Sequence, residues 1–193
     1  IEFQHQWQKA HGLTLRERAI AWLPRWAPWA ARLPWLANLR DALPFAARLT
    51  ERWTGLSARR TLPRWRRDTF ASTHPASGVS PENADVVLFV DTFTQYFEPE
   101  NAHAALAVLR AAGYRVAVAS PAPDDAEPGR PLCCGRTFLA GGRIDEARHE
   151  AKRLVAALAP AAARGATVVG IEPSCLLSLR DEFLVMGLGE PAQ

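Results

Sequence analysis

Cysteine is scarce in this sequence: the 193 residues contain three, at Cys133, Cys134 and Cys175. An odd number excludes a framework in which every cysteine is paired in a disulfide. Clustered free thiols are typical of a reducing compartment, where they serve metal or redox chemistry. We therefore expect a cytoplasmic protein, and the adjacent pair Cys133-Cys134 is the first feature that its function must explain.

Long hydrophobic runs are also missing. No stretch reaches the roughly 18 apolar residues that a membrane-spanning helix needs, and the opening IEFQHQWQKAHG lacks the basic and then apolar pattern of a signal peptide. The chain begins with Ile1, and its last apolar run fades into GLGEPAQ. We expect it to be a piece of a longer protein. A hydrophobic content of 48% is enough for one packed domain with an appendage.

Charge divides the chain into two parts. Residues 1–80 carry 13 basic and 5 acidic residues, a net charge of +8, whereas residues 81–193 carry 10 basic and 15 acidic residues, a net charge of −5. All seven tryptophans lie in the first part. The segment FASTHPASGVSPENAD joins the two and is typical of a linker. We predict a helical Arg/Trp-rich connector over 1–75, a linker over 76–83 and a second domain over 84–193.

The first part repeats a Leu-Pro step. Proline fits the first turn of a helix but not its interior, so each step is expected to restart a short helix. Helices of this length are unstable alone and must pack on something. The four steps are Leu23-Pro24, Leu33-Pro34, Leu43-Pro44 and Leu62-Pro63.

Three interpretations of the Arg/Trp-rich connector are open. Arginine and tryptophan bind phosphate and stacked bases in nucleic-acid proteins, and the same residues suit a helix lying on a membrane surface. A connector that packs its Trp and Leu on a neighbouring domain is the plainest alternative. We favour the connector, expect most tryptophans to pack against protein, and expect no nucleic-acid partner beyond weak, salt-sensitive binding. A peripheral contact with the inner membrane stays open.

The second part alternates strand and helix patterns. Buried apolar runs predict strands near 85–90, 114–119 and 166–171, with a helix that Gly113 ends and a long helix capped by Asp145 between them. This order predicts an α/β fold with a three-layer, Rossmann-like parallel sheet, preceded by the proline-broken helical segment.

The predicted strand ends gather the candidate site. Asp91 and Thr92 follow the first strand, the cysteine pair follows the second, and Glu172 and Cys175 follow the third. Because ligands collect beyond the carboxyl ends of parallel strands, we expect these residues to share one crevice. The alternative is that the cysteines are small buried hydrophobic residues. The position of the pair on a polar loop favours metal or cluster binding.

These motifs resemble a known family. CCG after a Rossmann-like strand and a later cysteine in EPSC are similar to the cysteine-rich CCG domain of glycolate oxidase iron-sulfur subunits and heterodisulfide reductase subunits. More narrowly, VLFVDTFTQYFEPENAHAALAVLRAAGYRV, RPLCCGRTFLAGGRIDEARHEA and VVGIEPSCLLSLRDEF resemble the C-terminal part of bacterial FAD-linked oxidases of D-2-hydroxy acids. The resemblance implies an electron-transfer role, an iron-sulfur cluster of the 4Fe-4S type, FAD in a missing N-terminal part, and flavin and ferredoxin-like domains of the same chain as partners.

The resemblance also assigns roles to residues. Cys133, Cys134 and Cys175 would be thiolate ligands, and Gly135 would let the backbone turn close to the cluster. The remaining assignments are a fourth ligand or an outer contact from Asp91 or Glu172, and an Arg136 that either lowers a thiol pKa or forms a surface ion pair. No role is assigned to His103 or His149.

The sequence departs from the family pattern at two places. Asp91-Thr92 stands where the family has its first cysteine, and Cys175-Leu176-Leu177-Ser178 stands where it has Cys-x-x-Cys. Three of five family cysteines remain, and the 193 residues hold no flavin or ferredoxin motif. We expect the fragment alone to be inactive. The rival interpretation is a docking module of the same flavoprotein that has lost its cluster.

Overall fold

The computed structural model describes residues 2–74 and 79–189, which divide into two compact units. The helical unit comprises Ile1–Arg67 together with Thr137–Ile144, and the α/β unit comprises Asp68–Arg136 together with Asp145–Gln193. The predicted linker 76–83 falls partly on residues 75–78, which lie outside the described residues. The rest of it includes the 3-10 turn η1 (Pro81–Asn83).

The helical unit contains six short helices before its extended segment: α1 (Glu2–His11), α2 (Leu15–Ala21), α3 (Leu23–Arg32), α4 (Pro34–Ala37), α5 (Leu39–Ala42) and α6 (Pro44–Thr54). Proline occupies the first turn of α3, α4 and α6, so three of the four Leu-Pro steps begin helices as predicted. The helix α10 (Arg136–Ala140) starts in one unit and continues in the other.

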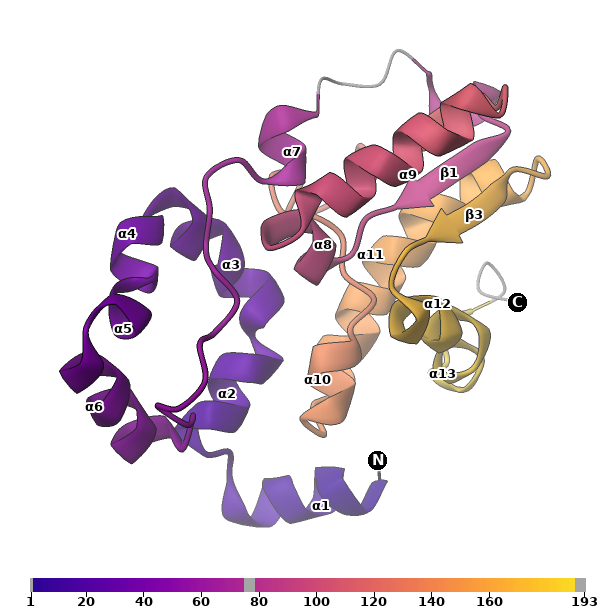
Figure 1. Cartoon of the computed structure of the whole chain (residues 1–193). Helices are drawn as coiled ribbons and strands as arrows, with labels where there is room; N and C mark the ends of the chain where they lie inside the picture. The colour runs from indigo at the N-terminus through magenta and orange to yellow at the C-terminus, as the bar shows by residue number, and fades with distance from the viewer. Residues whose placement is uncertain (1, 75–78, 190–193) are drawn as a thin grey trace. The chain divides into compact units, whose positions relative to one another are not determined.

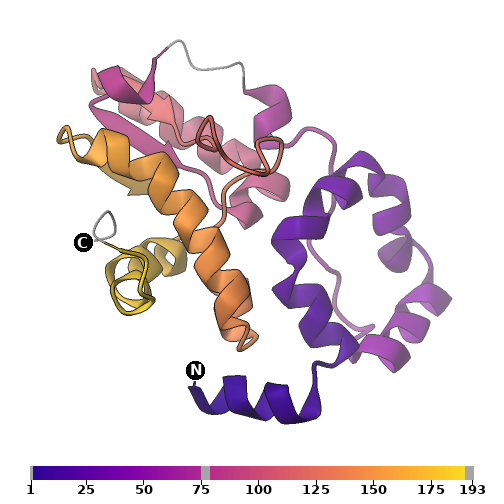
Figure 2. The ribbon, with the colours of Figure 1, turned by 180° about the vertical axis from the view of Figure 1, so that it is seen from behind.

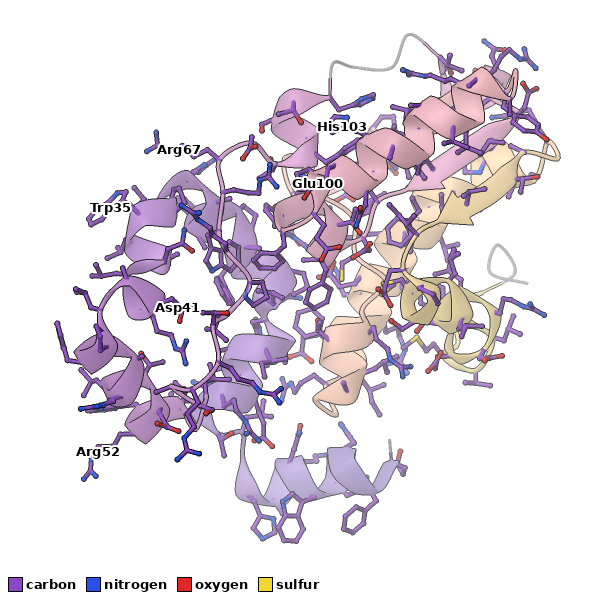
Figure 3. The ribbon with its side chains drawn as sticks, viewed as in Figure 1. Trp35, Asp41, Arg52, Arg67, Glu100 and His103 are labelled. Carbon is purple, nitrogen blue, oxygen red and sulfur yellow. The ribbon has the colours of Figure 1, made fainter. Side chains whose placement is uncertain are left out.

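The fourth step, Leu62-Pro63, does not begin a helix, and the expectation for it is wrong. Its backbone lies in a non-helical segment, which is held by the side chains of Asp41 in α5 and of Asn38, the residue before α5. The Leu62 N–H donates to the carboxylate of Asp41, a residue labelled in Figure 3, at 2.8 Å. The Trp65 N–H donates to Asn38 Oδ1 at 2.9 Å, and Asn38 Nδ2 donates to the Trp65 carbonyl at 2.8 Å. These bonds satisfy backbone groups that a helix would otherwise pair internally.

The expected burial of most tryptophans is not seen within the described chain. Five of the seven keep at least 36% of their surface exposed, and Trp65 alone is classed as buried, at 8%. The residues that these helices bury are mostly small, among them Ala21, Ala27, Ala31 and Ala47. Elements of four to eleven residues leave little interior for a large ring. Packing of the exposed rings on a partner stays a prediction.

The α/β unit is built on a three-stranded parallel sheet in the order β2-β1-β3. Strands β1 (Val86–Phe89), β2 (Val116–Val118) and β3 (Thr167–Gly170) fall within the three predicted ranges. In the register of the sheet, Val87 pairs with Ala117 on one side and with Val168 on the other. The remaining helices are α7 (Phe70–Thr73), α8 (Thr92–Tyr96), α9 (Pro99–Ala111), α11 (Ile144–Ala162), α12 (Pro173–Arg180) and α13 (Glu182–Val185).

Helices cover both faces of this sheet. Figure 1 shows α9 in front of the strands, and Figure 2, seen from behind, shows α11 over the opposite face. Val86 and Leu88 of β1 pack with Ala102 and Leu106 of α9 in one buried cluster. Each fully buried leucine contributes about 1.5–3 kcal/mol to folding. The predicted three-layer α/β fold is confirmed.

Two smaller predictions concern helix ends. Gly113 follows α9 with φ +89°, a left-handed conformation that glycine adopts without strain, as expected for a helix stop. Asp145 is not the cap of α11: the helix begins at Ile144, and Asp145 lies in its first turn, 3.1 Å from Arg148. Among the described residues, no helix combines the length and apolar character needed to cross a membrane.

Candidate functional site

The three cysteines form one buried cluster at the carboxyl-end edge of the sheet of the α/β unit, and we call this place the crevice. The Cys134 thiol donates a hydrogen bond to Cys175, with 2.9 Å between the two Sγ atoms. Cys133 is hydrogen-bonded to Cys134 and to the Thr92 hydroxyl. All three side chains are buried, and none forms a disulfide. The structure therefore brings Cys175 to the pair, with Thr92 on the same rim, as the strand ends predicted.

The crevice lies where the chain reverses its direction across the sheet. From β1 the chain crosses over α9 to β2 at one edge, and it then returns behind the sheet through α11 to β3 at the other edge. Thr92 follows β1 and Cys175 follows β3. Ligands of parallel α/β sheets usually bind at such a switch point, beyond the carboxyl ends of the strands.

Three helices begin at the crevice: α8 at Thr92, α10 at Arg136 and α12 at Pro173. Amides at the start of α10 point toward sulfur. The Gly135 N–H donates to Cys133 Sγ at 3.4 Å, and the Arg136 N–H donates to Cys134. Backbone N–H groups at helix starts carry partial positive charge and favour anionic ligands. These two amides are therefore donors that a thiolate could accept from, and they act to lower the pKa values of Cys133 and Cys134.

Without a cation, two of the thiols are held in their neutral form. The hydrogen bond with Cys134, burial and the charge of Cys134 raise the pKa of Cys133 well above its ordinary value. The bond with Cys133 lowers the pKa of Cys134, but the bond to Cys175, burial and the charge of Cys175 outweigh it and raise that pKa. A bound cation would favour the thiolate forms of Cys133 and Cys134.

The two candidate carboxylates at the rim are engaged as helix caps. Asp91 caps α8: its Oδ1 accepts from the Phe93 and Thr94 N–H groups at 2.8 and 3.2 Å, and its Oδ2 accepts from the Thr94 hydroxyl at 2.6 Å. Glu172 caps α12 through the Ser174 N–H at 3.2 Å. Both residues therefore position the helix starts that carry Thr92 and Cys175.

Arg136 follows the cysteine pair, but its guanidinium turns to Glu182 of α13 and forms an ion pair there. The side chain is 47% exposed. Of the two roles considered for Arg136, the ion pair is the one present. Its backbone N–H, and not its charge, acts on Cys134.

Gly135 makes the turn between the pair and α10 with φ +78°. A Cβ at this position would lie 2.8 Å from the Ala147 carbonyl oxygen of α11. A side chain would therefore intrude, as expected, but the obstacle seen is the backbone of α11. The glycine allows the cysteine loop to lie directly on that helix.

A buried ion network, which was not predicted from the sequence, holds this loop in place. Glu150 of α11 is 0% exposed. Its carboxylate accepts hydrogen bonds from Nη1 and Nη2 of Arg130 at 2.8 and 3.0 Å. Arg153 pairs with Asp125 at 2.9 Å and donates to the carbonyls of Arg130 and Glu127 at 2.9 and 3.1 Å. The backbone that leads into the cysteine pair is thus tied to α11 by two arginines.

A signal for this network exists in the sequence. Glu150 and Arg153 fall within the apolar stripe of the long helix, between positions that the structure buries: Ala147, Ala151, Leu154 and Leu158. Charges on an apolar face are rarely buried unless they are paired.

His103 and His149 have structural contacts: His103 Nε2 lies 2.8 Å from the Thr73 hydroxyl, and His149 lies 3.2 Å from Glu127.

The crevice fits an iron-sulfur ligand set in kind but not in spacing. Clusters take thiolate ligands, ordinarily four, and the crevice supplies three. In a 4Fe-4S cluster each cysteine binds a different iron, so the ligand sulfurs stand well apart, whereas Cys134 and Cys175 are 2.9 Å apart. Accordingly, within residues 2–74 and 79–189 no three His, Cys, Asp or Glu side chains are arranged as a metal site. A cluster requires the sulfurs to separate and a further ligand.

Comparison with known proteins finds a distant similarity to one subunit of an anaerobic glycerol-3-phosphate dehydrogenase. The subunits of Escherichia coli K12 and of Escherichia coli O157:H7 are each 26% identical to this chain over 151 residues. The alignment covers 77% of this chain and 36% of those proteins, so the chain spans about a third of their length. No family model and no solved structure matches.

Proposed function

We propose that this chain is the iron-sulfur-binding, electron-transfer portion of an oxidoreductase, with Cys133, Cys134 and Cys175 as cluster ligands. The observation that carries the proposal is the meeting of three buried thiols at the switch point of a parallel sheet, 41 residues apart in sequence at the closest sulfur contact. The distant similarity to part of a dehydrogenase supports the same class of function.

The chain's own residues would hold and insulate the cofactor. A bound cluster supplies one-electron transfer. The thiolates would bind it, the Gly135 and Arg136 amides would keep their hydrogen bonds to the Cys133 and Cys134 sulfurs, and the burial of the crevice would keep water out. The ion network of Glu150, Arg130 and Arg153 would fix the loop. We propose a 4Fe-4S cluster whose remaining ligand comes from another part of the full protein, because Asp91 and Glu172 are used as caps.

The resemblance supports a finer proposal. FAD, in a separate flavin domain, would take a hydride from a D-2-hydroxy acid of the glycolate, lactate or 2-hydroxyglutarate class, and a ferredoxin-like domain would lie between it and this chain. The similar Escherichia coli protein belongs to an enzyme named for glycerol 3-phosphate. Both substrates have a hydroxyl-bearing carbon, so an assay of the full protein should offer both.

Iron and sulfide analysis of anaerobically purified protein tests the proposal. We expect iron and acid-labile sulfide in equal amounts, bound by the full-length protein and lost when the cysteines are replaced. Protein that is folded but binds neither after anaerobic reconstitution would support the rival function, a cluster-free docking module in which the thiols are packing residues.

A second proposal concerns the helical unit, which we infer contacts an anionic membrane surface. Phe45, Leu49 and Trp53 of α6 follow one another at intervals of four residues and form an apolar stripe that is 67, 55 and 68% exposed. Arg48 and Arg52 lie beside the stripe. Figure 3 shows Trp35 and Arg52 projecting outward from the helical unit. A surface helix of a soluble protein normally exposes its polar face, whereas α6 exposes this apolar stripe to water.

Charge favours a lipid surface over a neutral protein partner. The helical unit contains 14 basic residues, counting Arg143, and 4 acidic residues, which gives a net charge of +10. Exposed aromatic and aliphatic side chains next to arginine are the composition of interfacial helices, whose apolar groups enter the headgroup region while the cations meet anionic lipid. Nucleic acid would use the arginines but would leave Leu49 and Phe45 in water.

A further inference from the structure

The α/β unit has a pocket that the proposed cluster does not use. Its volume is about 630 Å³, within the range of sites for small organic molecules. It lies at the carboxyl ends of β1 and β2, where Val90 and Val118 line one side. His74, the residue after α7, also lines it, as do Pro131 and Leu132 of the cysteine loop. We call this hollow the β1–β2 pocket.

Two polar side chains of the β1–β2 pocket have no partner among the described residues. Gln95 of α8 is 4% exposed and lines the pocket, and its side-chain amide makes no hydrogen bond to the described chain. His74 Nε2 is buried and has no hydrogen-bond partner in the same part of the chain. Buried polar groups are nearly always bonded, and each exception needs an explanation. His74 Nε2 is one such exception, and Gln95, which lines the same pocket, presents a further side-chain amide that a ligand could bond.

The walls of the pocket define the chemistry of that ligand. Most of the lining is apolar, with Phe70, Val90 and Leu132 among its largest side chains. Arg130 is the one charged residue among the described lining residues, and Glu127 and Glu150 already bind its guanidinium. The pocket therefore has no free cation to offer a ligand.

His74 adds no charge to the pocket. Burial, and then the nearby Arg110 and His103, lower its pKa, so its imidazole is neutral at neutral pH. The β1–β2 pocket, as far as the described residues line it, offers nothing to neutralise an anion, and its neutral hydrogen-bonding groups match an uncharged molecule.

We propose that the β1–β2 pocket binds an uncharged ring compound that carries a hydroxyl or carbonyl oxygen, with its ring on the apolar walls and its oxygen bonded by Gln95 and His74. Such a molecule would contact Leu132, the residue before Cys133, and Gln95 lies one helical turn after Thr92, which bonds that cysteine. A role as a small-molecule redox partner of the thiol site rests on the proposed function. Binding itself does not.

The test titrates the whole metal-free chain with 2-naphthol, followed by the fluorescence of the naphthol, with naphthalene and 2-naphthoate as comparators. We expect saturable binding of 2-naphthol. Loss of the hydroxyl in naphthalene should weaken binding about five-fold, the worth of one neutral hydrogen bond. The 2-naphthoate anion should not bind at the same concentrations, because no free cation of the described lining faces it.

Variants assign the binding to the pocket. Gln95→Leu and His74→Phe should each lower the affinity for 2-naphthol about five-fold and leave that for naphthalene unchanged. Gln6→Leu, on exposed α1, is the matched control and should change neither. Because the Gln95 amide has no partner in the described chain, Gln95→Leu should not lower the melting temperature. Absence of saturable 2-naphthol binding, equal binding of 2-naphthoate, or unchanged affinity in both pocket variants would overturn the proposal. Iron binding can fail without affecting any of these results.

Discussion

Cys134 and Cys175 lie 2.9 Å apart at their Sγ atoms, although 41 residues separate them in the sequence. The contact joins the loop that follows β2 to the helix that follows β3, and both strands run parallel to β1, so their carboxyl ends lie at the same edge of the sheet. Nothing local in either segment requires it. The pair is therefore the most direct place to ask whether the crevice is a ligand site or a piece of core.

Serine substitutions separate these two roles. Cys134→Ser and Cys175→Ser each remove one thiolate while nearly preserving volume, so each should prevent stoichiometric binding of iron on anaerobic reconstitution. Thr92→Val removes a hydroxyl that bonds Cys133 without removing a ligand, and we expect it to weaken iron binding about ten-fold. Iron and sulfide assays with circular dichroism check both. Wild-type iron content in the two serine variants would make the cysteines packing residues.

Replacing Glu150 tests the network that holds the cysteine loop. Glu150→Leu leaves the guanidiniums of Arg130 and Arg153 buried without their shared carboxylate, which should lower the free energy of unfolding by about 3–5 kcal/mol. The measurement is urea denaturation followed by circular dichroism. Asp145→Asn, on the same helix with a carboxylate that is 86% exposed, should change stability little. A stability loss no larger than that of the control would mean that the network does not support the fold.

Acid should weaken the same loop through Glu127. Its hydrogen bonds to Arg130, opposed by burial and aided by His149, lower its pKa from 4.5 to about 2. A carboxylate with a lowered pKa in the folded state contributes stability above its ordinary pKa, and the contribution is lost as the pH falls through the folded value. Wild-type stability should therefore fall between about pH 4.5 and about pH 2.

The Glu127→Gln variant isolates this contribution. We expect it to be less stable than the wild type near neutral pH and to lose less stability on acidification, so the two curves should converge toward about pH 2. Urea unfolding at several pH values measures the difference. Asp145→Asn should keep the wild-type dependence. Parallel curves for wild type and Glu127→Gln would show that the Glu127 carboxylate makes no pH-dependent contribution to the stability of the fold.

Much of this fold follows from local sequence patterns. The strands were predictable because buried parallel strands are continuous apolar runs, as in Val86–Phe89, and the meeting of Cys134 with Cys175 followed from the shared edge of those strands. The helix starts in the first part followed from proline. These features depend on neighbours in the chain or on one rule of sheet topology.

Other features depend on tertiary partners and were missed for that reason. The pairing of Glu150 with Arg130 joins a helix to a loop 20 residues earlier. From the sequence, Asp91 is a candidate metal ligand. In the structure its carboxylate instead caps α8 and accepts the Thr94 hydroxyl, a contact that depends on the three-dimensional position of Thr94. Trp53 is exposed because the helical unit is too small to bury many large side chains. The spacing of apolar residues in the sequence does not predict this limit.

Vesicle binding tests the apolar stripe of α6. The whole chain should bind vesicles of anionic phosphatidylglycerol and not neutral phosphatidylcholine, and high salt should weaken the binding because exposed charges are screened. A triple variant, Phe45→Ser with Leu49→Ser and Trp53→Ser, should lose most of it in a flotation assay. Val108→Ser and Val185→Ser, exposed in the other unit, serve as the control. Equal binding by the stripe variant, or sequence-specific DNA binding that survives physiological salt, would contradict a membrane role.

A pair of glycine substitutions separates backbone strain from contact at the cysteine loop. Gly135 and Gly165 have similar left-handed angles, φ +78° and +88°, but a Cβ at Gly165 meets nothing within 4 Å, whereas one at Gly135 lies 2.8 Å from the Ala147 carbonyl oxygen. Gly165→Ala should therefore cost only the left-handed strain, about 1–2 kcal/mol. Gly135→Ala should cost more, because the loop must move off α11, and it should also lower iron binding since the adjacent cysteines move with it. Urea denaturation and iron analysis of the two variants measure these effects. If the two alanine variants lose equal stability and keep equal iron, the contact with α11 does not position the cysteine pair.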